Sequence, residues 1–79
     1  MITPEQFRMA RAVLRLSTRK LGAELDISAV AISRYERGDE KVISLETAKK
    51  AVALFNGYGI HFGPSHGVVL ARMYSIKNK

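Results

Sequence analysis

The hydrophobic and polar positions near the N-terminus follow the period of an amphipathic helix. Apolar side chains recur three or four residues apart, at Phe7, Ala10, Val13 and Leu14. Thr3 and Pro4 are residue types that open helices, and Gln6 completes a capping-box pattern with Thr3. The pattern predicts a first helix from Pro4 to about Arg15. Its other face carries arginines, at Arg8, Arg11 and Arg15.

Two shorter helices are predicted next, each opened by a serine. Ser17 is a helix-capping residue ahead of a helix from Thr18 to about Leu25. Ser28 has the same position ahead of a helix from Ala29 to about Arg37, and Gly38 is a strong stop signal. Two short helices separated by a tight turn form the core of a helix-turn-helix. This part of the chain, roughly residues 17–38, is therefore predicted to be such a motif.

A glycine inside the first of these two helices indicates where they cross. Gly22 lowers helix propensity by about 1 kcal/mol relative to alanine, so a packing reason is expected. Apolar residues are available to close a small core around the crossing: Leu21, Leu25, Ile27, Ile32 and Tyr35. The outer side of the second helix then carries Ser28, Ala29, Val30, Ser33, Arg34 and Arg37. Its side chains are short at the start and basic at the end, which suits entry into a DNA major groove.

The last part of the chain predicts one more helix and a β-hairpin. Ser44 precedes a helix from Leu45 to about Phe55, with Leu45, Ala48, Val52 and Phe55 on one face and Asn56-Gly57 as its break. Asp39 to Lys41 is expected to be a polar loop. Two short apolar runs, 60–62 and 68–70, are joined by a turn-rich link at 63–67, as in a hairpin. An isolated hairpin is unstable in water, so it must dock on the helices or on another subunit.

The fold class expected is thus mainly α, a bundle of four to five helices with a short C-terminal β-hairpin. We expect a helix-turn-helix unit over residues 1–57. Residues 58–79 are expected to form the hairpin and tail, a dimerisation extension of the same domain.

Composition narrows the classes of function. A length of 79 residues allows one domain. The sequence has no cysteine, which excludes a disulfide framework and thiolate metal sites. No apolar run approaches the ~18 residues of a membrane span, and the N-terminus lacks a signal-peptide pattern, so a cytoplasmic, nucleoid-associated protein is expected. The net charge of +6, from 13 basic and 7 acidic residues, favours a polyanionic partner.

Catalytic and metal chemistry have little support in the sequence. No nucleophile–base pair, carboxylate dyad or phosphate-cradling glycine loop is present, so an enzyme is not expected. His61 and His66 lack clustered carboxylates or cysteines beside them, so we expect no metal site and no cofactor.

The helix-turn-helix segment resembles a known family. The residues that carry the resemblance are Ser17 to Leu25, then Ile27-Ser28, then Ile32 to Gly38, of which Tyr35-Glu36-Arg37-Gly38 is the clearest motif. They are similar to the Xre family, the lambda-repressor-like and Cro-like DNA-binding domains, over about residues 3–55. The hairpin resembles an extension found in some small phage and bacterial regulators.

The resemblance implies roles for matching positions. The helix from Ala29 would be the recognition helix, with Ala29, Val30, Ser33 and Arg34 facing base edges. Residues near phosphates would be Thr18 with its neighbour Arg19, Ser28, Arg37 and Lys41. Arg11 and Glu36 align with a structural ion pair. Three departures stand out: Asp26 replaces the usual turn glycine, Lys20 stands where a Glu or Gln capping partner is common, and Asp39 and Glu40 place negative charge in a loop that is often basic.

The function expected is a sequence-specific transcriptional regulator. A single recognition helix reads few base pairs, so binding to double-stranded DNA as a homodimer at a near-palindromic operator is expected. The hairpin, residues 60–70, is the preferred dimer contact because two hairpins can pair edge to edge. Repression by covering a promoter would follow. Two alternatives remain open: an antitoxin that also binds a toxin, and a protein-interaction module with the same fold.

Overall fold

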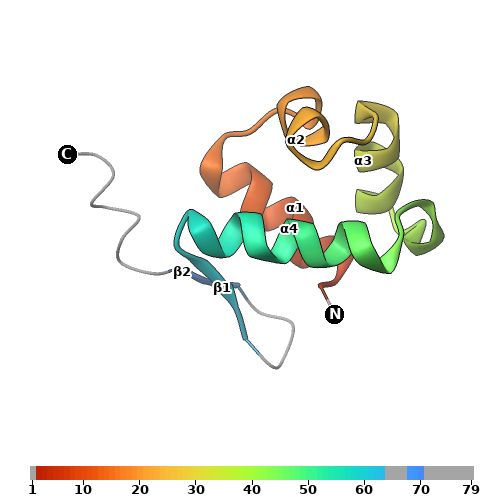
Figure 1. Cartoon of the computed structure of the whole chain (residues 1–79). Helices are drawn as coiled ribbons and strands as arrows, with labels where there is room; N and C mark the ends of the chain where they lie inside the picture. The colour runs from red at the N-terminus through yellow and green to blue at the C-terminus, as the bar shows by residue number, and fades with distance from the viewer. Residues whose placement is uncertain (1, 64–67, 71–79) are drawn as a thin grey trace.

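The computed structural model describes residues 2–63 and 68–70, which form a helical bundle with a two-stranded antiparallel sheet (Figure 1). In chain order the elements are α1 (Pro4–Leu14), α2 (Thr18–Leu25), α3 (Ala29–Glu36), the 3-10 helix η1 (Glu40–Val42), α4 (Leu45–Gly57), β1 (Ile60–Phe62) and β2 (Val68–Leu70). The predicted fold class, mainly α with a C-terminal hairpin, is confirmed.

Each α-helix begins at the residue that its capping chemistry predicts. Ser17, Ser28 and Ser44 are N-caps whose side chains accept a hydrogen bond from a backbone N–H in the first turn. Thr3 forms the predicted capping box with Gln6, each side chain bonding the other residue's backbone N–H. These bonds satisfy backbone groups that a helix leaves unpaired at its start.

The predicted break of the fourth helix at Asn56-Gly57 is wrong. Helix α4 continues through Gly57, and the N–H of Tyr58 still donates to carbonyls of the last turn. Glycine lowers helix propensity but does not forbid helical geometry. The chain leaves the helix at Gly59, whose φ of +90° is left-handed and favours glycine. The predicted polar loop after Gly38 also differs, since it contains the single turn of η1.

Three aromatic rings form the centre of the core. The ring of Phe7 packs edge-to-face against Tyr35 at 5.1 Å and against Phe55 at 5.6 Å, measured between centroids, and all three are fully buried. The hydroxyl of Tyr35 donates a 2.8 Å hydrogen bond to the carbonyl of Ile2, and burial raises the pKa of this hydroxyl. Ile2 is buried too, at the position from which a hydrophobic staple packs onto the first helix.

One residue of the predicted inner face of α4 does not join this core. Leu45 is 58% exposed, whereas Ala48 and Phe55 are buried and Val52 packs against the core from its edge. Leu45 is the first residue of α4. It lines an open apolar hollow of about 350 Å³ with Ile2, Ala48, Lys49 and Val52.

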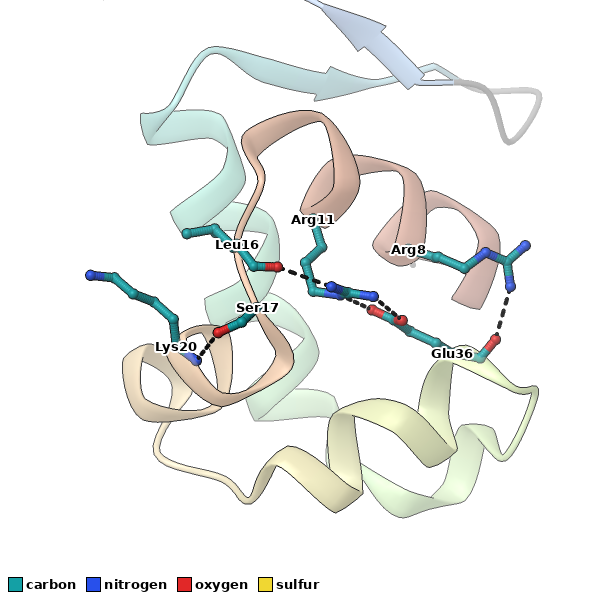
Figure 2. A network of polar contacts seen from close by, with 6 residues as sticks. All are labelled: Arg8, Arg11, Leu16, Ser17, Lys20 and Glu36. Carbon is teal, nitrogen blue, oxygen red and sulfur yellow. Dashed lines mark hydrogen bonds and ion pairs between the residues drawn. The ribbon is translucent and has the colours of Figure 1, made fainter.

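The hairpin docks on the helices, one of the two placements that the sequence allowed. Ile60 pairs with Leu70 and Phe62 with Val68, while β1 contacts α4 and β2 contacts α1. Ile60 is fully buried, and the ring of Phe62 lies 6.0 Å from that of Phe55. Both views place the hairpin at the opposite end of the bundle from α2 and α3 (Figures 1 and 2). The predicted link around His66 and the tail lie outside the described residues.

Candidate nucleic-acid interface

Helices α2 and α3 cross at Gly22, as the sequence predicts. A Cβ atom at this position would lie 2.6 Å from the backbone carbonyl oxygen of Ile27 and 3.3 Å from the carbonyl carbon of Ser28. Both neighbours belong to the backbone of the turn, so they cannot rotate away as a side chain can. The N–H of Ile27 donates to the carbonyl of Gly22 at 2.9 Å. Glycine therefore allows the turn to pack directly onto α2.

The turn between the two helices bends at Asp26. Its φ of 61° and ψ of 42° are left-handed, the conformation that aspartate tolerates better than most residues and that the family's usual glycine adopts freely. Ser28 then caps α3 by accepting a 3.0 Å hydrogen bond from the N–H of Ala31. On the inner side, Leu21, Leu25, Ile32 and Tyr35 are buried, which holds the two helices at one relative orientation.

The outer side of α3 is available to a large ligand. Val30, Arg34 and Arg37 are exposed and lie four and three residues apart, so they form one stripe along the helix. Val30 is 67% exposed, the largest exposure among the large hydrophobic residues described. Ala29 and Ser33 beside the stripe are partly exposed, and Ser28 at the start of the helix is exposed. Six predicted site residues are thus brought onto one accessible face.

The other predicted site residues flank this face. Thr18 is the first residue of α2 and is partly exposed, and Arg19 beside it is exposed. Lys41 is exposed in η1, the turn that follows α3. The start of α2 also presents backbone N–H groups, which favour an anion such as phosphate.

A partly buried ion pair joins α1 to the end of α3 (Figure 2). The guanidinium of Arg11 holds both carboxylate oxygens of Glu36, with its Nε 2.7 Å from Oε2 and its Nη2 2.8 Å from Oε1. Its Nη1 donates to the carbonyl of Leu16 at 2.9 Å, and Arg8 donates to the backbone carbonyl of Glu36 at 3.2 Å. The hydrogen bond to Glu36 raises the pKa of Arg11. The ion pair implied by the family resemblance is therefore present.

A second ion pair lies on the outer face itself. Nη2 of Arg34 is 2.5 Å from Oδ2 of Asp39, and the two side chains are 53% and 38% exposed. The sequence drew attention to the negative charge of Asp39 but not to this partner. A signal was available, because an arginine followed four residues later by a stop glycine and then by an aspartate can place both side chains at the helix end.

A family model described as helix-turn-helix, HTH_3, matches residues 7–60, which is more than half of the chain. The chain belongs to the Xre and Cro-like helix-turn-helix family. No curated protein and no solved structure matches it. The matched segment runs from Phe7 in α1 to Ile60 in β1, and so includes the Gly22 crossing, the Arg11–Glu36 pair and the outer face of α3.

Membership of the Xre family makes this chain a DNA-binding transcriptional regulator in general terms. The family is one of DNA-binding regulators and not a family of enzymes. Within the described residues, none of the helices has both the length and the apolar character needed to cross a lipid bilayer.

Proposed function

We propose that this Xre-type regulator is a repressor that binds a near-palindromic operator as a homodimer, with α3 of each subunit in the major groove. The observation that carries the proposal is the exposed stripe of Val30, Arg34 and Arg37 on a helix whose other face is buried. A helix held by its core at one orientation presents the same side chains to every DNA site. That constancy is what reading a base sequence requires.

The residues of the stripe suit direct reading of bases. A guanidinium such as that of Arg34 can donate two hydrogen bonds to O6 and N7 of guanine. Val30 has no polar group, and an exposed apolar side chain near the start of a recognition helix can contact the methyl group of thymine. Ala29 and Ser33 are short enough to let the helix backbone approach the floor of the groove. We therefore assign these four residues to base contacts.

Contacts to phosphate are assigned to the flanking residues. Thr18 and Arg19 lie at the start of α2, where the helix dipole favours an anion, and Ser28 starts α3. Arg37 lies at the C-terminal end of α3, and Lys41 lies in η1, which follows it. Such contacts add affinity without selecting sequence, and the net charge of +6 supports them.

Dimerisation is assigned to the hairpin over residues 60–70. The hairpin lies at the opposite end of the bundle from α2 and α3, so contacts through it would leave the proposed DNA face free (Figure 1). A two-stranded sheet has open edges, and pairing two hairpins would satisfy them. Two recognition helices would then address half-sites about one helical turn, or about 34 Å, apart. Occupancy of such a site in the cytoplasm would block transcription from an overlapping promoter.

Alanine variants of two arginines separate base reading from phosphate binding. Arg34→Ala is expected to lower discrimination at one base pair of each half-site by about 1–3 kcal/mol, or about 5- to 150-fold. Arg37→Ala is expected to weaken binding to all sequences similarly and to reduce the slope of log affinity against log salt by about 1. Dissociation constants for a selected duplex and its single-base variants, at two salt concentrations, measure both effects.

Lys49→Ala is the matched control for these variants, because Lys49 is exposed on α4 and lines the hollow beside Ile2, outside α2 and α3. It should keep the wild-type base preferences. If Arg34→Ala also keeps them, the proposed role of α3 is wrong. Sequence-blind binding by the wild type would instead favour a protein-interaction module, and a toxin partner would then be sought through the hairpin.

A further inference from the structure

We infer that Asp39 is a positioning residue that sets the base selectivity of Arg34. Its carboxylate favours one orientation of the guanidinium beside the outer face of α3, in which the remaining donors are directed toward a base edge and less often toward nearby phosphates. The inference rests on the proposed function, since it names what makes that recognition helix selective.

The backbone at the end of α3 brings the two residues together. The N–H of Gly38 donates to the carbonyl of Tyr35 at 2.9 Å, and the N–H of Asp39 donates to the carbonyl of Arg34 at 3.1 Å. Together with the left-handed φ of +110° at Gly38, these bonds form a Schellman motif. The motif reverses the chain and sets the backbone of Asp39 against that of Arg34. The helix end therefore places the two side chains close enough to form the observed ion pair.

The contact leaves Arg34 able to bind DNA. A guanidinium has five N–H donors, and the bond to Asp39 uses a single nitrogen, Nη2. The remaining donors include an edge that can form two parallel hydrogen bonds. An unrestrained arginine carries about 2 kcal/mol of side-chain rotamer entropy and reaches many phosphate oxygens as easily as one base. Pairing with Asp39 reduces part of that freedom before binding and favours one orientation of the remaining donors.

Stability does not account for the pair. Both side chains are substantially exposed, and exposed ion pairs contribute little to folding because solvent screens them. A carboxylate at this position also repels DNA phosphates, which lowers affinity for every sequence. Asp39 therefore lowers the affinity for DNA of every sequence and raises selectivity at the base pair that Arg34 reads. Its neighbour Glu40 bears the same charge, is exposed, and is not the partner of Arg34, so it separates the general effect from the specific one.

Variants of the full chain in which an acidic side chain is replaced by its neutral amide test the inference. Asp39→Asn and Glu40→Gln each remove one negative charge, and both should raise affinity for a scrambled duplex by a similar factor. Asp39→Asn alone should reduce discrimination at the base pair read by Arg34, by about fivefold or more on the scale of one bidentate contact, with other positions unchanged. Asp39→Glu should retain more of the discrimination than Asp39→Asn, because the carboxylate is kept. In an Arg34→Ala background, Asp39→Asn and Glu40→Gln should become indistinguishable.

Dissociation constants for a selected duplex, for its single-base variants and for the scrambled duplex give all of these readouts. The inference is overturned if Asp39→Asn and Glu40→Gln change base discrimination equally. It is also overturned if Asp39→Asn increases base discrimination, because the ion pair would then hinder the contact between Arg34 and the base. A wild-type chain that selects no sequence would instead overturn the proposed function, and this inference with it.

Discussion

Replacing Arg11 with methionine is expected to lower the free energy of unfolding by about 2–3 kcal/mol. The carboxylate of Glu36 is 7% exposed and would lose both of its charged donors, since Arg11 supplies them at 2.7 and 2.8 Å. Removing one partner of a buried pair costs about 3–5 kcal/mol. The expected loss is smaller because the side chain of Arg11 is itself 22% exposed, so water can reach the site. Urea-induced unfolding followed by circular dichroism measures the change.

Two further variants identify the cause of that loss. Arg15→Met makes the same chemical change at an exposed residue just after α1, and should leave stability within about 0.5 kcal/mol of the wild type. The double variant Arg11→Met with Glu36→Leu removes the stranded charge and should recover much of the lost stability. If the double variant is less stable than Arg11→Met alone, the loss arises from packing and not from the unpaired carboxylate.

Replacing Gly22 with alanine is expected to destabilise the domain by about 1–3 kcal/mol, the range for an overpacked core position. The added methyl group would meet the carbonyl oxygen of Ile27 at 2.6 Å, so the backbone of the turn must move. This outweighs the gain in helix propensity of about 1 kcal/mol that alanine brings. Because the turn sets the position of α3, affinity for a selected DNA site should also fall, by more than the loss of folded protein explains.

Gly57→Ala is the matched control for this substitution. Gly57 is also helical, and a Cβ atom there would have no neighbour within 4 Å. The same change should therefore be neutral or stabilising by up to about 1 kcal/mol. Thermal unfolding should show a lower midpoint for Gly22→Ala and an equal or higher midpoint for Gly57→Ala, relative to the wild type. Equal shifts would show that the close approach at Gly22 has no energetic consequence.

Local chemistry explains why most of the fold could be predicted. A serine or threonine cap bonds a backbone group within the same turn, so Thr3, Ser17, Ser28 and Ser44 mark helix starts without knowledge of the rest. Gly22 was predicted to lie at the helix crossing because a glycine inside a helix needs a packing reason. The Arg11–Glu36 pair joins residues 25 positions apart, and the family resemblance supplied it where local patterns could not.

The features that were missed depend on how elements meet. The periodicity of α4 places Leu45 on its inner face, but whether a neighbour covers that first turn depends on tertiary packing, and Leu45 stays exposed. Gly57 and Gly59 are both glycines near a helix end, and only the backbone conformation shows that Gly59 is the left-handed one. The partner of Arg34 required knowing that the chain reverses at Gly38 and returns Asp39 to the same face.

We propose that α3 of this Xre-type regulator reads a DNA sequence twice, once in each subunit of a dimer. Selection of bound duplexes from a random pool, repeated at two salt concentrations, tests it most directly. We expect enrichment of one two-fold-symmetric site with half-sites about 34 Å apart, and an affinity that falls steeply with salt. A pool that stays random through repeated selection, or an enriched site without symmetry, would contradict it.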